Sequence, residues 1–349
     1  MRTNNLLSQD LDHIIGHTKG LWKHLRAKKI FVTGGTGFFG KWLLESFVWV
    51  NDRLKLDAQM HVLSRDPVSF KTRHLHLAQA SGVRFHQGDI RDFDFPQEQF
   101  DFIIHAATDA SVQLNLENPL LMLDTIVEGT RRTLEFARDC RAKRFLLISS
   151  GAVYGKQPPD LSHTQEEYSG APDTTQSSSA YGEAKRIAEL MCTIYQKQYG
   201  IGITVARCFA FVGPYLNLDI HYAVGNFIRD ALTGGPIHVS GDGTPCRSYL
   251  YAADLAIWLW ILLLRGDPGA AYNVGSEKTI SIRDLAYEVK AAFSNVPEVV
   301  IRKCPSPGMK AESYVPSIRK ARESLGLDSW INLREALHRT IKWHQLMSL

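Results

Sequence analysis

Short apolar runs alternate with longer amphipathic stretches through much of this chain. The runs have the length and flanking turn residues of buried strands, and the stretches between them repeat apolar residues at helical spacing. Strands that alternate with helices form right-handed crossovers, which build a parallel sheet with helices on both faces. We therefore predict an α/β protein with a doubly wound parallel sheet. The predicted strands are KIFVTG, MHVLSR, VRFHQGD, FDFIIHAAT, RFLLISS and ITVARCFAF, and the clearest helices cover residues 118–140 and 179–200.

Both ends of the chain depart from this alternation. Apolar residues at helical spacing over 5–27 predict additional N-terminal helix, with a packing role. Beyond Gly213 the pattern is mixed, which predicts a smaller lobe. Its expected strands are PIHVSG and RSYLY, and its expected helices cover 253–265, 281–294 and 332–347. The predicted divisions are a helical extension over 1–27, a sheet domain over 28–210, and a smaller mixed α/β C-terminal lobe over 211–349, some segments of which return to the sheet.

Residues 156–179 interrupt the alternation with a stretch rich in Pro, Ser, Thr and Asp that has no periodicity. This composition predicts a long surface loop. Loops of that length are uncommon inside compact domains and often act as lids or binding elements.

Charge and cysteine content narrow the classes of function. A net charge of +4 is mild, and 40 basic residues are scattered among 36 acidic ones, so no basic stripe indicates a nucleic-acid partner. The five cysteines are widely spaced without a CxxC pair, so we expect reduced thiols and no metal site. The N-terminus lacks the features of a signal peptide, and the longest apolar run, 256–264, is too short to span a bilayer. We expect a soluble cytoplasmic protein with no membrane partner.

The sequence GGTGFFG lies directly after one predicted strand and directly before an amphipathic helix. Glycines in this context allow a tight turn, close approach of the backbone to a pyrophosphate, and close packing of helix on strand. Gly34, Gly37 and the helix-opening Phe38 and Phe39 are therefore predicted to bind a dinucleotide. The alternative is a tight turn without a ligand. With a ligand, residues 28–210 are a Rossmann domain that binds NAD(P), and the C-terminal lobe binds the substrate.

The end of the second strand bears on which dinucleotide binds. Ser64 follows Gly40 by 24 residues, near the position where an acidic residue that binds the ribose is expected. Serine does not repel a 2′-phosphate as a carboxylate would, and the guanidinium of Arg65 can pair with one. NADP is therefore favoured over NAD. The alternative is that Arg65 is a solvated loop residue beside Asp66.

The next two strands end in further candidate cofactor contacts. A carboxylate in GDIRD can accept a hydrogen bond from the adenine amino group, although it can equally cap a turn. Small residues in HAAT allow the cofactor to lie against the backbone, whereas His105 is expected to be packed. The contacts predicted here are Asp89, Ile90, Ala106, Ala107 and Thr108.

The sequence YGEAK places Tyr181 and Lys185 four residues apart, on one face of a predicted helix. An ammonium near a phenol favours the phenolate and lowers the tyrosine pKa from its ordinary value of ~10. Tyr181 then becomes a proton donor and acceptor near neutral pH, and the hydroxyl of Ser150 can hold the same substrate oxygen. With a nicotinamide, these groups are suited to oxidise an alcohol or reduce a ketone.

Taken in order, the motifs from Lys28 to the C-terminus resemble those of the extended short-chain dehydrogenase/reductases of the nucleotide-sugar epimerase and dehydratase family. The motifs are TGGTGFFG, GDIRD, HAAT, SSGAVYG, YGEAK, RCFAFVGPY, GDGTPCRSYLYAADLA and YNVGSEKTISIRDLA. The resemblance implies a catalytic Ser150, Tyr181 and Lys185, a contact of Arg247 with the diphosphate of a nucleotide-sugar, and a structural role for Asp254. It also implies a homodimer that pairs the helices near 118–140 and 179–200.

The chain departs from the family pattern at several positions. Ala210 and Ile126 stand where the family often has asparagine. Gly151 and Ala152, expected to line the substrate site, stand where the dehydratases usually carry an Asp-Glu or Ser-Glu pair. In that comparison the carboxylates are the acid and base that remove water after C4 is oxidised.

Three functions follow from these residues. The leading one is an NAD(P)-dependent enzyme that transfers hydride at C4 of a nucleotide-diphosphate hexose, as a 4-ketoreductase or a 4-epimerase, and Arg65 favours the reductase. A 4,6-dehydratase is the alternative enzyme, but needs another acid and base, such as Glu166 or Glu167. A non-catalytic NADP-sensing regulator is the alternative of another class, and the complete set of Ser150, Tyr181 and Lys185 argues against it.

Overall fold

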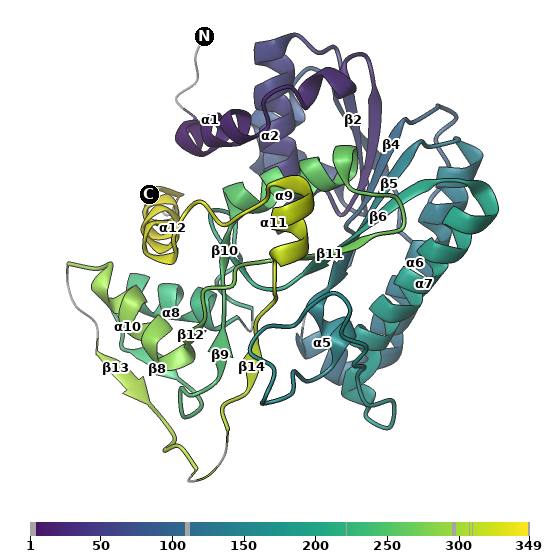
Figure 1. Ribbon diagram of the computed structural model, residues 1–349. Coiled ribbons are helices and arrows are strands. Elements are labelled where there is room, and N and C mark those ends of the chain that lie inside the picture. Colours follow the sequence, from purple (N-terminus) through teal and green to yellow (C-terminus); the bar gives the residue numbers. More distant parts are fainter. Residues whose placement is uncertain are drawn as a thin grey trace. The chain divides into compact units, whose positions relative to one another are not determined.

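A computed structural model describes residues 5–108, 112–220, 222–294, 298–306, 308 and 310–347. Its centre is a seven-stranded sheet with strand order β11-β6-β5-β4-β1-β2-β3 (Figure 1). The pairings of β1 with β2 and β4, of β2 with β3, and of β4 with β5 are all parallel. The prediction of a doubly wound Rossmann-type α/β fold is confirmed. The strands are β1 (Lys29–Thr33), β2 (Gln59–Ser64), β3 (Val83–Gln87), β4 (Phe102–His105), β5 (Arg144–Ser150), β6 (Gly202–Cys208) and β11 (Ala271–Val274).

The chain divides into two compact units that exchange segments along the sequence. The first contains Met1–Val153, Pro172–Arg207 and Ala256–Tyr272, and the second contains Tyr154–Ala171, Cys208–Leu255 and Asn273–Leu349. The helical elements of the first unit are α1 (Ser8–His17), η1 (Trp22–Leu25), α2 (Phe38–Leu54), α3 (Pro67–Arg73), α4 (Leu75–Ala78), α5 (Val112–Glu117), α6 (Pro119–Asp139), η3 (Ser177–Ser179) and α7 (Ala180–Tyr199). Two helices cross the division, namely η2 (Gly151–Tyr154) and α9 (Ala252–Arg265).

The core of the first unit lies between the sheet and the pair α6 and α7, which run side by side (Figure 1). Phe31 of β1 lies at its centre and contacts the rings of Phe93, Phe100 and Phe136 at centroid separations of 5.7, 5.3 and 4.8 Å. Large apolar rings in this layer bury the face of the sheet and fix the level at which α6 and α7 pack on it.

The N-terminal helices pack on the first unit through apolar side chains. Leu11, Ile14 and Leu25 are fully buried. Trp22 donates to Thr18 Oγ1 at 2.8 Å and meets the ring of Trp260 edge-on at 5.1 Å. Residues 1–4 of the predicted extension lie outside the described part of the chain. The described part of the extension is therefore built into the core.

The second unit is a mixed α/β lobe with three small sheets, ordered β10-β7, β12-β9-β14 and β13-β8. Asp254 lies fully buried there, and its Oδ2 accepts backbone N–H bonds from Trp330 at 3.0 Å and Ile331 at 2.9 Å. Asp254 thus has a structural role. The strands are β7 (Phe211–Val212), β8 (Ile237–Val239), β9 (Cys246–Arg247), β10 (Leu250–Tyr251), β12 (Ile280–Ser281), β13 (Val299–Ile301) and β14 (Ser313–Tyr314), and the helices are α8 (Ala223–Leu232), α10 (Ile282–Ala291), α11 (Arg319–Leu325) and α12 (Leu333–Met347).

The aperiodic stretch 156–179 is shared between the two units. Its first part is held within the second unit, where Thr164 donates to Val315 O at 2.9 Å and accepts from Ser317 N at 2.7 Å. Gln157 adds a side-chain acceptor for Val315 N at 2.9 Å. Backbone pairing therefore anchors a segment that composition alone describes only as a surface loop.

Candidate active site

The glycine-rich turn after β1 is shaped by close approaches of the backbone. Gly34 has φ +70°, and a Cβ there would lie 2.5 Å from the carbonyl oxygen of Ala106 at the end of β4. A Cβ on Gly40 would lie 2.3 Å from Cα of Gly35, so only glycine lets α2 start this close to the turn. Gly37 caps α2 and lies exposed, and a Cβ on it would meet nothing closer than Gly34 O at 3.4 Å. The turn thus presents open backbone ahead of Phe38 and Phe39, which begin α2.

The carboxyl ends of β2 and β3 carry the residues predicted to meet the adenosine half of a dinucleotide. Ser64 is buried as the last residue of β2, and Arg65 after it is exposed. Asp66 accepts from Ser69 N at 2.9 Å and so caps α3. The Asp66 carboxylate is therefore engaged in capping α3.

Asp89 follows β3 and is held by a neighbouring arginine. Its Oδ1 accepts from the backbone N and the side-chain Nε of Arg91, at 3.0 and 2.8 Å. The hydrogen bonds from Arg91 hold the pKa of Asp89 below its usual range, and the charge of Arg65 adds to this effect. Asp89 therefore caps a turn, as one of its two predicted roles requires, and lies within electrostatic reach of Arg65. Ile90 is buried, and Cγ1 of its side chain would lie 2.9 Å from a Cβ on Gly129 of α6.

The end of β4 is fixed by a threonine on β1. Thr33 Oγ1 accepts from the backbone N of Ala106 at 3.2 Å and of Ala107 at 3.1 Å, and it lies 2.8 Å from His105 Nδ1. Burial lowers the pKa of His105 to about 3, and the charge of Lys185 acts in the same direction. His105 is thus a neutral, packed residue, and the backbone after it is set rigidly beside the glycine turn.

Lys185 is buried at the junction of three elements. From α7, its Nζ donates to Thr108 Oγ1 after β4 at 2.7 Å and to Ile148 O of β5 at 2.9 Å. The same Nζ lies 6.0 Å from the centroid of the Tyr181 ring, one helical turn earlier. These two acceptors, a hydroxyl and a backbone carbonyl, hold the ammonium in place. The structure therefore brings Tyr181, Lys185 and Thr108 together.

The start of α7 packs closely against the turn that follows β5. A Cβ on Gly182 would lie 2.9 Å from Ala152 O and 2.7 Å from Pro172 Cγ. Ser150, the last residue of β5, is buried and its Oγ accepts from Ala152 N at 3.1 Å. The segments SSGAVYG and YGEAK, far apart in sequence, therefore meet within the first unit.

A further residue, not singled out from the sequence, holds the start of α7. Asn115 of α5 accepts from Tyr181 N at 3.1 Å and donates to Ser178 O at 2.7 Å. The sequence signal is weak, because an asparagine near a helix is as typical of a cap or a loop as of a contact across 66 residues.

Comparisons with known proteins show the family to which this chain belongs. The model of the family described as "NAD dependent epimerase/dehydratase family" matches residues 30–275. This chain belongs to that family. It is 33% identical over 313 residues to UDP-glucuronic acid decarboxylase 6 of Arabidopsis thaliana, covering 88% of this chain and 86% of that protein. It is 31% identical to UDP-glucuronic acid decarboxylase 1 of Xenopus tropicalis, covering 90% of this chain and 72% of that protein.

Solved structures show the same fold in other members of the epimerase/dehydratase family. UDP-glucose 4-epimerase of Thermotoga maritima, solved with UDP-glucose, superimposes with a TM-score of 0.78 at 23% identity, covering 92% of this chain and all of that one. The dTDP-glucose 4,6-dehydratase of Bacillus anthracis, solved with NAD, gives a TM-score of 0.74 at 19% identity, covering 91% of this chain and 97% of that one.

In this epimerase/dehydratase family member, the carboxylates predicted from the sequence as alternative acids and bases lie in the second unit. Glu166 lies in the second unit, and its Oε1 accepts from Asn273 N at 2.8 Å. Burial raises the pKa of Glu166, whereas Glu167 beside it is exposed. Arg247 also lies in the second unit, where it pairs with Glu312 at 2.9 Å.

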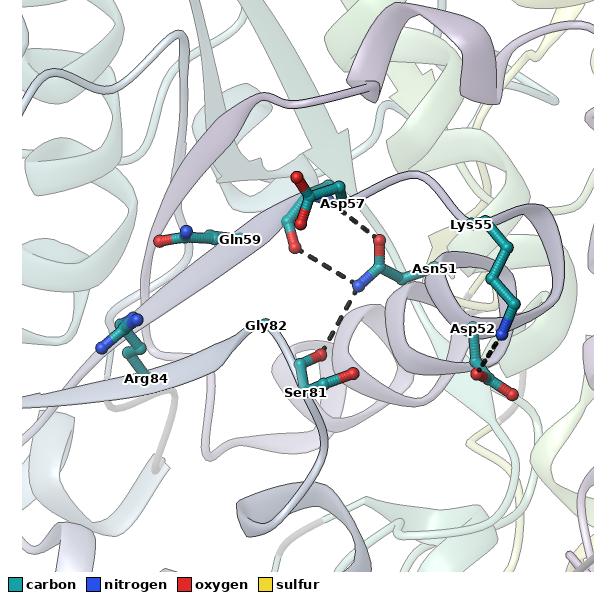
Figure 2. Close-up of a pocket in the computed structure, with 9 residues that line it drawn as sticks. Asn51, Asp52, Lys55, Asp57, Gln59, Ser81, Gly82 and Arg84 are labelled. Atoms are coloured by element: carbon teal, nitrogen blue, oxygen red, sulfur yellow. Dashed lines mark hydrogen bonds and ion pairs between the residues drawn. The ribbon is translucent and has the colours of Figure 1, made fainter.

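A polar hollow lies at the opposite edge of the sheet from the glycine turn. Figure 2 shows Asn51 among the residues that line it. The Asn51 side-chain amide donates to Ala58 O at 3.3 Å and to Ser81 O at 3.5 Å. Lys55 pairs with Asp52 at 3.2 Å. The starts of β2 and β3 form this edge, so the hollow is separate from the residues predicted to bind a cofactor, which follow the ends of the strands.

Metal ligands and membrane helices are both absent from the described residues. No group of three or more His, Cys, Asp and Glu side chains among them has an arrangement that holds a metal ion. No helix within the described ranges has both the length and the apolar character needed to cross a membrane.

Proposed function

We propose that this family member binds NAD(P) and transfers hydride at C4 of a nucleotide-diphosphate hexose, as a 4-ketoreductase or a 4-epimerase. The observation that carries the proposal is the fixed Lys185 ammonium beside Tyr181, on a helix that packs against a turn without carboxylates, Gly151 and Ala152. Such a site can move a proton at one sugar oxygen, and in the described turn after Ser150 neither Gly151 nor Ala152 offers a group for a second acid-base task.

The residues present fit a nicotinamide dinucleotide. The open backbone at Gly37 and the close approach at Gly34 leave a cradle that any side chain would fill. When bound, the nicotinamide supplies or accepts the hydride. We assign this role to the first unit and substrate binding to the second. NADP rather than NAD is favoured by the exposed Arg65, by the absence of a carboxylate at Ser64, and by the engagement of Asp66 with α3.

Three side chains would carry the chemistry at C4. In reduction, the Tyr181 phenol gives its proton to O4 as hydride reaches C4; in oxidation, the phenolate takes that proton back. The Lys185 ammonium, 6.0 Å from the centroid of the Tyr181 ring, would favour the phenolate form that takes this proton. Ser150 orients O4 by a hydrogen bond.

Dehydration is disfavoured because it needs two more proton transfers. One group must take the C5 proton and another must protonate the departing C6 hydroxyl, and neither Gly151 nor Ala152 exchanges protons. Of the two sequence-based substitutes, Glu166 accepts a backbone bond from Asn273, and Glu167 is exposed. The described turn after Ser150 therefore supplies neither the acid nor the base of a 4,6-dehydratase.

Decarboxylation is a second candidate, favoured by the relatives named UDP-glucuronic acid decarboxylase. Oxidation at C4 of a C6 uronate gives a β-keto acid. The C5–C6 bond then breaks, CO₂ leaves, and the electron pair is held as an enolate at O4 by Tyr181 and Ser150. No base is needed at C5 for this step, so Gly151 and Ala152 do not oppose it.

Partners follow from the same proposal. Arg247 would contact the diphosphate, exchanging its pairing with the exposed Glu312 for phosphate oxygens.

We also propose a homodimer through α6 and α7, which expose Leu120, Ile187, Leu190 and Ile194 by 72, 38, 59 and 42%. A cytoplasmic location is supported by five cysteines that form no disulfide, three of them buried.

The test is a substrate panel with mass spectrometry of the products. The purified protein is incubated with nucleotide-hexoses, their 4-keto-6-deoxy derivatives and nucleotide-uronates, each with NAD and NADP. We expect a gain of about two mass units on a 4-keto sugar, or a C4 epimer of unchanged mass. Loss of about 44 mass units from a uronate selects decarboxylation, and loss of about 18 from a hexose selects dehydration. Cofactor binding without any turnover would support the regulator instead.

A further inference from the structure

Glu189 lies on the same face of α7 as the two proposed catalytic residues. Tyr181, Lys185 and Glu189 follow one another at intervals of four residues. Four residues span about 6 Å of helix, so Glu189 stands one turn beyond Lys185. Its side chain is only 14% exposed, so its charge needs partners.

Those partners are on the two neighbouring strands of the sheet. Glu189 Oε1 accepts from Ser149 Oγ of β5 at 2.5 Å. Both carboxylate oxygens accept from Nε of Arg207 on β6, at 3.1 and 3.2 Å, and Oε2 accepts from Nη2 at 2.7 Å. The guanidinium is also largely buried, at 17% exposure. One carboxylate on α7 is thus bonded to both β5 and β6, which fixes the position of this turn of the helix along the two strands.

This junction lies beside the residues whose placement matters for catalysis. Ser149 immediately precedes Ser150, and Ile148 before it accepts from Lys185. Any slide of α7 along β5 would move Lys185 and Tyr181 relative to Ser150. A buried, multiply bonded ion pair contributes little net stability over apolar packing, but it specifies one arrangement of the elements that it joins.

We propose that Glu189 is a positioning residue, which acts through Ser149 and Arg207 to set the level of Tyr181 and Lys185 against Ser150. The inference rests on the proposed C4 hydride transfer for its kinetic readout. It has a second readout that needs no substrate. Thr108 Oγ1 and Ile148 O hold Nζ of Lys185 from outside α7, whereas the Tyr181 ring moves with the helix, so a slide of α7 changes the distance between ammonium and phenol and with it the acidity of the phenol.

The test removes the pair without changing net charge. Glu189→Gln with Arg207→Gln takes away one negative and one positive charge, so a shift in the Tyr181 phenol reports geometry. The matched control is Asp52→Asn with Lys55→Gln, an exposed pair of opposite charges 3.2 Å apart at the C-terminal end of α2, in the polar hollow away from the glycine turn. The phenol midpoint is measured by ultraviolet difference titration of each protein against the same protein carrying Tyr181→Phe.

We expect the Glu189/Arg207 variant to lose about tenfold in kcat, to raise the phenol midpoint by about half a pH unit or more, and to keep its Kd for NAD(P) within about twofold. The control should match the wild type in all three. Glu189→Asp, which keeps the charge but is one methylene shorter, serves if the double variant does not fold, and we expect it to lower kcat by about threefold or more.

Wild-type kcat and midpoint in a folded Glu189/Arg207 variant, or in Glu189→Asp where only that variant folds, would overturn the inference. Failure of the proposed function looks different: the wild type would turn over no substrate in the panel, while the phenol titration would still test Glu189.

Discussion

At the scale of single residues, the chemistry depends on Tyr181 and on what surrounds it. Its ring lies 6.0 Å from the ammonium of Lys185, which two neutral acceptors hold in place. The neighbouring turn carries Gly151 and Ala152, so Tyr181 is the residue of this group placed to exchange a proton with the sugar. Under the proposed function, this arrangement limits the site to redox chemistry at C4 and to steps that follow from it without a further base.

Tyr181→Phe should therefore reduce kcat by ~10²-fold or more while leaving Kd for NAD(P) nearly unchanged, because only the proton relay is lost. Steady-state rates on the active member of the substrate panel, together with nicotinamide fluorescence titration, measure both quantities. Near-normal turnover in the variant would remove Tyr181 from the mechanism.

Arg65 tests the preference for NADP. Arg65→Ala should weaken NADP binding by about 1 to 3 kcal/mol and leave NAD binding almost unaffected, because a charge-assisted contact with the 2′-phosphate is specific to NADP. Fluorescence titrations with each cofactor provide the measurement, and NAD is the internal control. An equal loss for both cofactors, or none for either, would mean that Arg65 is an ordinary loop residue.

At the scale of elements, the position of α7 is decided by contacts from several directions. Asn115 of α5 holds its first turn, Lys185 and Glu189 tie it to β5, and Gly182 lets it approach Ala152. The sequence predicts this helix to within about one residue at each end, since 179–200 compares with Ala180–Tyr199. Its contacts were not predictable, because they come from residues on other elements, far from Tyr181 along the chain.

Asn115→Ala should lower kcat by about tenfold with Kd for NAD(P) within about twofold, because Tyr181 loses its backbone anchor. Asn118→Ala is the matched control. Asn118 caps α6 through Leu121 N at 3.2 Å, so its loss should cost about 1 kcal/mol of folding stability and leave kcat unchanged. Steady-state kinetics give kcat for the two variants, and thermal unfolding gives their stability. A wild-type kcat in Asn115→Ala, as expected for Asn118→Ala, would mean that Asn115 contributes only to stability.

At the scale of the whole molecule, α6 and α7 run side by side (Figure 1), and large apolar side chains on both helices are exposed. A monomer rarely leaves such a cluster to solvent. These helices are the ones that the family resemblance pairs in a homodimer. The same α7 that carries Tyr181 and Lys185 on its inner face would then be braced on its outer face by a second copy.

Leu190→Glu should convert the protein to a monomer, because a charge at the centre of an apolar interface loses its hydration without gaining a partner. Val68→Glu changes an exposed apolar residue of α3 in the same way; it is the control and should leave the assembly unchanged. Light scattering coupled to gel filtration gives the mass of each. A monomeric wild type, or a Leu190→Glu protein of unchanged mass, would contradict the proposed homodimer.

The sequence by itself determined the sheet, the glycine turn and the spacing of Tyr181 and Lys185, because each depends on residues close together along the chain. Periodicity reports which face is buried, and four-residue spacing on a helix brings two side chains together whatever surrounds them. Only the tertiary structure decided which polar groups are already engaged. Asp66 caps α3, Glu166 accepts a bond from Asn273, and Glu189 joins Ser149 to Arg207. A hydrogen bond needs atoms within about 3 Å, and for distant residues that distance is set by how the elements pack.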